Sequence, residues 1–191
     1  MKRRFSKALG RRTHGNPDAP VSTMGEEESF EHIGALDHDP FLLILDQVQD
    51  PRNLGACLRS ADGVGIDLVV LPSDRSAGLT EIVRHVACGA VENLHIVRVV
   101  NLARYLERLS QMGICLVGTS DQAKKSVFDA DLSGPCGIIM GAEETGIRRL
   151  TAKHCDELIF IPMSGNVECL NVSVATGVCL FEAHRQRNVQ A

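Results

Sequence analysis

One loop near the C-terminal end of the sequence carries the side chains best suited to holding a small ligand. In IFIPMSGNVECLNVSVATGVCLFEAHRQR (residues 159–187), a short apolar run stops at a proline and leads through a polar loop into a segment with helical spacing. Such a loop presents backbone N–H groups and short polar side chains beyond a strand end. It therefore predicts a ligand-binding loop, although capping of the helix is also expected of its Asn and Ser residues. The polar members are Ser164, Asn166, Cys169, Asn171 and Ser173.

A second candidate cluster follows the first apolar run, in LDQVQDPRNLGACLRSADGVG (residues 45–65). Asp50 and Pro51 are typical of a turn that starts a helix. Asn53 and Arg59 are six residues apart on that helix, and both side chains can reach its open end. The alternative is a helix-start Asn and an exposed Arg in a surface ion pair.

A third cluster lies in IIMGAEETGIRRL (residues 138–150), where Gly141 ends a strand and Glu143 and Glu144 follow. The segment lacks the Lys-Ser/Thr pair that a phosphate-binding P-loop needs, and no strand leads into a GxGxxG motif. A nucleotide bound in Rossmann fashion is therefore not supported. A turn with solvated glutamates is the alternative interpretation.

The elements that must position these clusters form an alternating series. Six short runs are apolar throughout, which is typical of strands buried on both faces: residues 41–45, 67–71, 94–100, 114–119, 136–140 and 158–161. Helical patterns lie between and after them, at residues 53–64, 79–87, 102–111, 148–154 and 171–187. The alternation predicts an α/β fold with a mostly parallel sheet and helices on both faces. In such sheets ligands bind beyond the carboxyl ends of the strands, which is where the three clusters fall.

Length and composition exclude several classes of protein. The chain has 191 residues, 44% of them hydrophobic, which fits one globular domain with an additional tail. No apolar run approaches the roughly 18 residues of a membrane span, and no signal-peptide core is present, so we expect a soluble, cytoplasmic protein. The seven cysteines form no CxxC pair and no HExxH motif occurs, so we expect no metal site.

Charge is distributed unevenly along the chain. Residues 1–12 carry six of the 20 basic residues and no acidic one, which leaves 14 basic against 24 acidic residues in the remainder. A basic tail on an acidic body is a common arrangement for nucleic-acid binding, and a solubilising tail is the alternative. Residues 1–39 are predicted to be a polar, basic extension that is partly disordered, with a small core around Phe30 and Ile33; residues 40–191 form the main domain.

Together, the motifs NLGACLRSAD, MGAEETGIRRLT, HCDELIFIPM and LNVSVATGVCLFEA closely resemble the SpoU (TrmH-type) family of RNA ribose 2′-O-methyltransferases, within the SPOUT superfamily. The resemblance covers residues 40–187, about four-fifths of the chain. It implies a deep trefoil knot, S-adenosylmethionine as methyl donor, and a homodimer in which both subunits contribute to each active site. It further implies an RNA substrate, most closely a guanosine of 23S ribosomal RNA.

The resemblance also implies roles for individual residues. Donor-binding positions, which act mostly through backbone groups, match Gly118, Thr119, Gly141, Ile161, Met163 and Leu170. Arg59 matches the catalytic arginine, which serves as a base or as a positioning group, and Asn53 is its companion at the ribose. Glu143 organises the site, and Asn171 and Ser173 complete it.

Two departures from the family pattern leave alternatives open. Cys169 stands where the family usually has Ser, and a thiol is the weaker hydrogen-bond donor. Only about 40 residues precede the first motif, where relatives of this type carry an RNA-binding domain, so the chain is either a short form that relies on its basic tail or a trimmed product. The rival functions are a transfer RNA ribose 2′-O-methyltransferase, or an RNA-binding or assembly protein that keeps the knot with little turnover.

Overall fold

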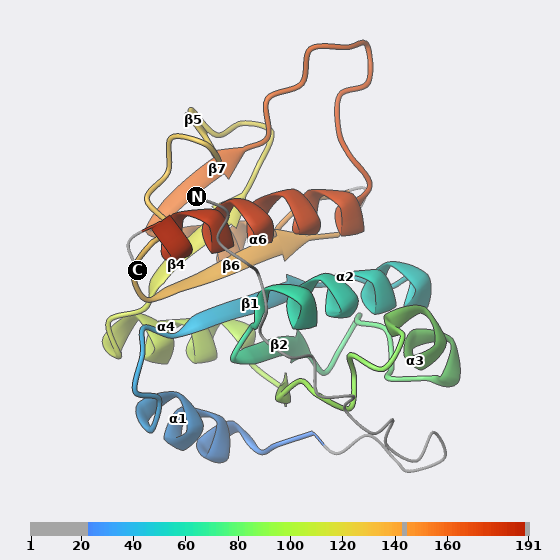
Figure 1. The fold of residues 1–191 in the computed structure, drawn as a ribbon, viewed down its shortest axis with the longest axis vertical. Coiled ribbons are helices and arrows are strands. Elements are labelled where there is room, and N and C mark those ends of the chain that lie inside the picture. Colours follow the sequence, from blue (N-terminus) through green and yellow to red (C-terminus); the bar gives the residue numbers. More distant parts are fainter. Residues whose placement is uncertain (1–22, 143–144, 190–191) are drawn as a thin grey trace, which may run out of the picture.

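A seven-stranded parallel sheet forms the centre of the protein (Figure 1). The structure is a computed structural model, and it describes residues 23–142 and 145–189. The strand order is β3-β2-β1-β6-β4-β7-β5. The strands are β1 (Phe41–Asp46), β2 (Leu68–Pro72), β3 (Ile96–Val99), β4 (Cys115–Thr119), β5 (Lys125–Ser126), β6 (Cys136–Gly141) and β7 (Glu157–Phe160). The helices are α1 (Glu26–Gly34), α2 (Pro51–Val64), α3 (Glu81–Ala87), α4 (Leu102–Gln111), α5 (Arg149–Lys153) and α6 (Val172–Val189).

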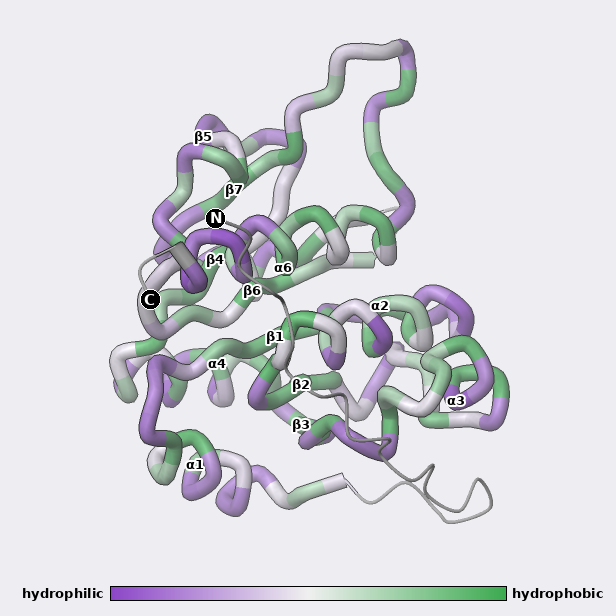
Figure 2. The backbone as a smooth tube through the Cα atoms, in the orientation of Figure 1, coloured by the Kyte–Doolittle hydropathy of each residue, from purple (hydrophilic) through white to green (hydrophobic). Residues whose placement is uncertain are grey.

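Both faces of the sheet are covered by helices. Successive side chains of a strand point to opposite faces, so Leu43 and Leu45 of β1 pack with α2, α3 and α6, while Leu42 and Ile44 pack with α1 and α4. All six residues of β1 and of β6 are buried, as their uninterrupted apolar sequences predict. Green and purple segments alternate along α3 and α4 in Figure 2, as expected of helices with one side on the core.

The predicted α/β class, the parallel sheet and the helices on both faces are confirmed. Each of the six predicted strands is present, and the five predicted helices are present with ends shifted by up to two residues. The two-residue strand β5 was not predicted, because Lys125 and Ser126 have no apolar pattern. None of the described helices has the length and apolar character needed to cross a membrane.

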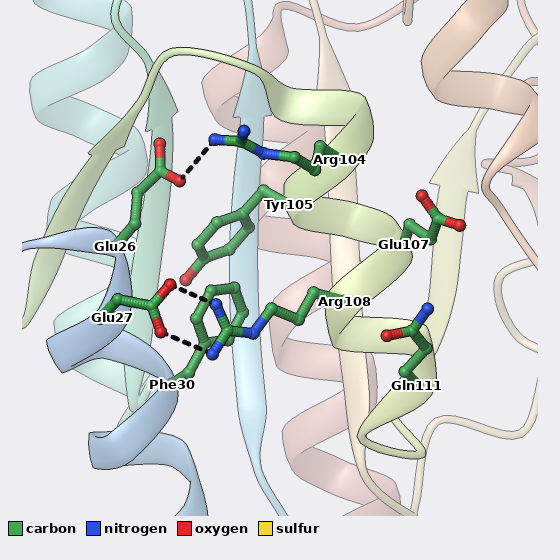
Figure 3. Close-up of a pocket in the computed structure, with 8 residues that line it drawn as sticks. All are labelled: Glu26, Glu27, Phe30, Arg104, Tyr105, Glu107, Arg108 and Gln111. Atoms are coloured by element: carbon green, nitrogen blue, oxygen red, sulfur yellow. Dashed lines mark hydrogen bonds and ion pairs between the residues drawn. The ribbon is translucent and has the colours of Figure 1, made fainter.

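The helix α1 lies within residues 1–39, where no helix was predicted. The small core expected around Phe30 and Ile33 is present, since both side chains are buried. Glu27 pairs with Arg108 of α4, whose guanidinium also lies 3.9 Å from the ring centroid of Phe30. Figure 3 shows these side chains bridging the two helices. The expected disorder of residues 1–22 lies outside the described residues.

The phenol of Tyr105 is expected to resist ionisation far into the alkaline range. Burial raises the pKa of Tyr105 from 10.0 to about 12, against the opposing effect of its 2.6 Å hydrogen bond with Ser29. Because the folded protein holds this proton more tightly than the unfolded chain, the group stabilises the fold below pH 10 and that contribution is lost as pH rises toward 12.

Tyrosinate absorbance measures this directly, because Tyr105 is the single tyrosine of the chain. We expect a titration midpoint near pH 12 in the native protein and near pH 10 in urea. Tyr105→Phe is the control that must remove the signal. A native midpoint near pH 10 would contradict the buried position of the ring.

Candidate functional site

Four loops meet at the carboxyl edge of the sheet. Because β6 lies between β1 and β4, and β7 lies beside β4, the segments after these strands are brought together although they are far apart in the sequence. They are residues 47–50, residues 120–124, residue 142 with residues 145–148, and residues 161–171. Figure 1 shows the last of them projecting from the body before it enters α6. The segments that hold the three clusters singled out in the sequence therefore meet at this edge, as far as the structure describes them.

The starts of α2 and α6 are joined by a pair of amide side chains. Asn171 Nδ2 donates to Asn53 Oδ1 at 3.1 Å, across 118 residues of sequence. Asn171 Oδ1 in turn accepts from the backbone N–H and the hydroxyl of Ser173, at 2.9 and 2.6 Å, as a helix N-cap does. Capping and site formation thus use the same residue. The structure brings together the predicted site residues Asn53, Asn171 and Ser173.

Arg59 lies on the exposed side of α2, between that helix and the end of α3. Its Nη1 donates to the Sγ of Cys88 at 3.4 Å, and Cys88 adopts a left-handed conformation with φ of 52° at the end of α3. The helices approach closely because of Gly55, where a Cβ would lie 2.8 Å from the carbonyl oxygen of Val83. The guanidinium therefore has a defined position on the outside of α2.

Two predicted donor-binding glycines sit where no side chain fits. A Cβ at Gly141 would overlap the backbone of Gly146 and Ile147, because the loop after β6 folds back on the strand end. A Cβ at Gly118 would lie 2.6 Å from Cys155 Sγ and 2.8 Å from Ile147 Cδ1. The neighbouring Thr119 donates its hydroxyl to the carbonyl oxygen of Ile139 at 3.2 Å, which ties the ends of β4 and β6 together.

The loop of residues 161–171 supplies the remaining predicted donor positions. Ile161 packs against the core, Leu170 is half-buried, and Met163 is exposed. Within the described residues, the backbone N–H groups of residues 163–170 donate no hydrogen bond. Unused backbone donors beside apolar side chains suit a ligand with both an aromatic ring and polar edges. Cys169 is exposed in the same loop, and Glu143 lies outside the described residues.

The sequence interpretation missed one charged pair at this edge, Asp46 with Arg148. Asp46 ends β1 and is fully buried, and Arg148 Nη2 lies 2.7 Å from its Oδ1. An acidic residue directly after an apolar strand was the available signal, since an aspartate buried at a strand end requires a partner. The sequence could not show which residue is that partner, because Arg148 lies 102 residues further along the chain.

Three cysteines have thiols that resist ionisation. Burial raises the pKa of the Cys136 thiol to about 11 and the pKa values of the partly buried Cys155 and the buried Cys179 to about 12, which favours the protonated thiol at neutral pH. In the part of the chain that the structure describes, no three His, Cys, Asp or Glu side chains gather to hold a metal ion.

Comparison with known proteins identifies the family. The model of the SpoU rRNA Methylase family matches residues 40–181. The chain belongs to this family. It is 53% identical over 172 residues to 23S rRNA (guanosine-2′-O-)-methyltransferase RlmB of Pseudomonas putida, covering 90% of this chain and 69% of that protein. It is 55% identical over 163 residues to RlmB of Escherichia coli K12, covering 85% of this chain and 67% of that protein.

Solved structures of SpoU proteins agree with this assignment. The SpoU methyltransferase AviRb from Streptomyces viridochromogenes, in complex with AdoMet, superposes with a TM-score of 0.73 at 30% identity, over 81% of this chain and 63% of that one. An AdoMet-bound rRNA methyltransferase from Sinorhizobium meliloti gives 0.72 at 30% identity, over 78% of this chain and 57% of that one. The resemblance noted in the sequence is confirmed, and membership of the SpoU family carries with it the knotted SPOUT fold. The return of α6 to pack on α2, in the first half of the chain, fits that fold.

Proposed function

We propose that this SpoU-family protein transfers a methyl group from S-adenosylmethionine to the ribose 2′-oxygen of a guanosine in 23S ribosomal RNA. The observation that carries the proposal is the junction of α2 and α6, where Asn53 and Asn171 are hydrogen-bonded at the same sheet edge as the glycine-lined loops. The identity of 53–58% to proteins named RlmB supports the choice of ribosomal RNA and guanosine. The chain spans about two-thirds of the length of those relatives.

The donor is proposed to bind among the loops after β4, β6 and β7. Gly118 and Gly141 let the loop after β6 pack directly on the ends of β4 and β6, and the N–H groups of residues 163–170, which donate no hydrogen bond within the described residues, are available for the ligand. Ile161 and Leu170 supply apolar surface for a flat ring. Thr119 is proposed to help hold the donor in the same cradle. When bound, S-adenosylmethionine supplies an activated methyl group on a positively charged sulfur.

The acceptor ribose is proposed to lie between the amide pair and Arg59. Methyl transfer needs the 2′-hydroxyl held in line with the donor, so most of the catalysis is positioning. Guanidinium groups remain charged in proteins, which makes Arg59 a poor base and a good partner for an RNA phosphate or for negative charge that develops on the 2′-oxygen. Asn53, Asn171 and Ser173 are proposed to orient the ribose, and Glu143 to organise the site.

Cys169 is expected to be a benign replacement for the serine of the family. Its side chain is exposed, and in-line transfer to an oxygen forms no enzyme adduct. We therefore expect Cys169→Ser to keep turnover within about threefold of the parent, the scale of an ordinary surface substitution. The measurement is the initial rate of methyl transfer under saturating donor and RNA. Complete loss of activity in the serine variant would show that the thiol takes part in the reaction.

A homodimer and a cytoplasmic location are part of the proposal. Val174 and Phe181 are seven residues apart on α6, so they share one side of the helix, and they are 52% and 53% exposed. An exposed apolar strip beside the proposed site fits a second copy of the chain. Sedimentation equilibrium tests this, with Phe181→Glu expected to shift the protein toward monomer. Ribosomal RNA as substrate is the reason for the cytoplasmic location.

The test of the function is methylation of defined RNAs. The purified protein is incubated with S-adenosylmethionine and unmodified 23S ribosomal RNA or transfer RNA, and the products are mapped by mass spectrometry. We expect one 2′-O-methylguanosine in 23S ribosomal RNA. Methylation of transfer RNA alone would establish the rival substrate. Donor binding without transfer to either RNA would point to an RNA-binding or assembly role.

A further inference from the structure

The side chain of Asp46 receives two hydrogen bonds and one further ion-pair contact, all from Arg148 in the loop after β6. The backbone N–H of Arg148 donates to Asp46 Oδ2 at 3.0 Å, and Arg148 Nε donates to Oδ1 at 2.8 Å. The Nη2 of Arg148 is a further 2.7 Å from Oδ1. Both the main chain and the side chain of Arg148 are therefore fixed against the end of β1.

The burial of Asp46 makes its contact with Arg148 necessary for the folded chain. Asp46 is 0% exposed, whereas the side chain of Arg148 is 41% exposed. A buried carboxylate without hydrogen bonds to a cation is strongly unfavourable, so few other arrangements of the two residues are accessible to the folded chain. The bonds to Nε and to the backbone N–H fix the orientation of the guanidinium as well as its charge.

The contact lies beside the proposed donor cradle. Asp46 is in register with Gly141 on the neighbouring strand β6. After Gly141 the chain turns back, with Ala142 and Gly146 exchanging two backbone hydrogen bonds of 3.1 and 2.9 Å. Arg148 follows this turn directly, so the Asp46 contact anchors its far end.

Anchoring Arg148 also places its neighbour Ile147. The Cδ1 of Ile147 packs against Gly118, 2.8 Å from where a Cβ would be, and the backbone of Ile147 occupies the space beside Gly141. Gly118 and Gly141 are the proposed donor positions on β4 and β6. A shift of Arg148 would therefore move the wall between two of the three donor loops.

From this geometry we infer that Asp46 and Arg148 are a positioning pair that sets the affinity of the protein for S-adenosylmethionine. The inference rests on the proposed function and extends it to two residues outside the donor- and ribose-binding set. They act through Ile147, Gly141 and Gly118 rather than on the reacting atoms. The predicted signature is a weaker donor site with little change in the chemical step.

The test is calorimetric titration of S-adenosylmethionine into the 191-residue chain without RNA. Arg148→Gln removes the charge and both guanidinium contacts with Asp46 Oδ1, and we expect the dissociation constant to rise about tenfold or more, the scale of a lost charged hydrogen bond. Arg149→Gln is the matched control, since Arg149 is the next residue, is exposed, and loses the same charge in this variant. It should bind the donor within about twofold of the parent.

A second variant keeps the test decisive if Arg148→Gln does not fold. Arg148→Lys retains a cation next to Asp46 but offers no fork of two N–H groups, so we expect an intermediate loss of affinity with a melting temperature near that of the parent. In the methyl-transfer assay, the KM for the donor should rise in both variants. Turnover at saturating donor and the KM for RNA should stay within about threefold of the parent.

The outcomes distinguish the role of the positioning pair from the proposed function. Donor binding by the parent and the Arg149 variant, with weak binding by the Arg148 variants, supports the positioning pair. Equal donor binding by all folded proteins overturns it and leaves the proposed function intact. A parent protein that binds no S-adenosylmethionine overturns the proposed function, and the positioning role with it.

Discussion

Arg59→Ala is expected to abolish methyl transfer while leaving donor binding unchanged. Arg59 lies on the exposed side of α2, with its guanidinium held by the sulfur of Cys88, and none of the proposed donor loops includes it. Removing the guanidinium takes away the group proposed to hold the RNA and to balance charge at the 2′-oxygen. We expect turnover to fall by about a thousandfold, the upper range for loss of one charge-stabilising group.

The measurements are single-turnover methyl transfer and calorimetric titration of the donor. Arg104→Ala is the control for loss of a surface arginine, because Arg104 is exposed on α4, across the sheet from α2, and pairs with Glu26 at 3.4 Å. It should retain near-normal turnover. If Arg59→Ala also proceeds at a rate close to that of the parent, the assignment of Arg59 is wrong.

Gly141→Ala is expected to damage both the fold and the donor site. The added methyl group would overlap the backbone of Gly146 and Ile147, and backbone atoms cannot turn aside as a flexible side chain can. Relief requires the loop after β6 to move away from the strand end. We expect the free energy of unfolding to fall by roughly 3 kcal/mol, the scale of overpacking in a dense interior. Donor affinity should fall by at least about tenfold, since 1.4 kcal/mol corresponds to a factor of ten.

Gly134→Ala provides the matched control for this substitution. A Cβ at Gly134 meets nothing within 4 Å, so the same change of residue type should leave unfolding and donor binding unaltered. Urea denaturation followed by circular dichroism gives the stability, and calorimetry gives the affinity. A Gly141→Ala protein as stable as the parent, with unchanged donor affinity, would show that the loop is not packed on the strand end.

Much of the fold could be predicted from the local pattern of apolar and polar residues. Strands buried on both faces must be apolar throughout, so β1 and β6 were apparent as uninterrupted runs. The starts of helices could also be predicted from neighbouring residues. Asp50, directly before α2, accepts a hydrogen bond from the backbone N–H of Arg52 in the first turn of that helix. The helix α1 was missed because its acidic surface suggests a solvated tail. Its stability comes from the bonds of Glu27 and Ser29 to α4, more than 70 residues away.

The fold class, the family, and the residue types at the carboxyl edge of the sheet could all be predicted from the sequence. These depend on short-range periodicity and on motifs whose members are close along the chain. Which of those residues meet depends on the tertiary structure. The strand order places β6 beside β1, which sets Asp46 against Arg148, and the packing of α6 on α2 sets Asn171 against Asn53. Contacts across more than 100 residues leave no periodic trace, because the geometry that creates them exists only once the sheet has formed.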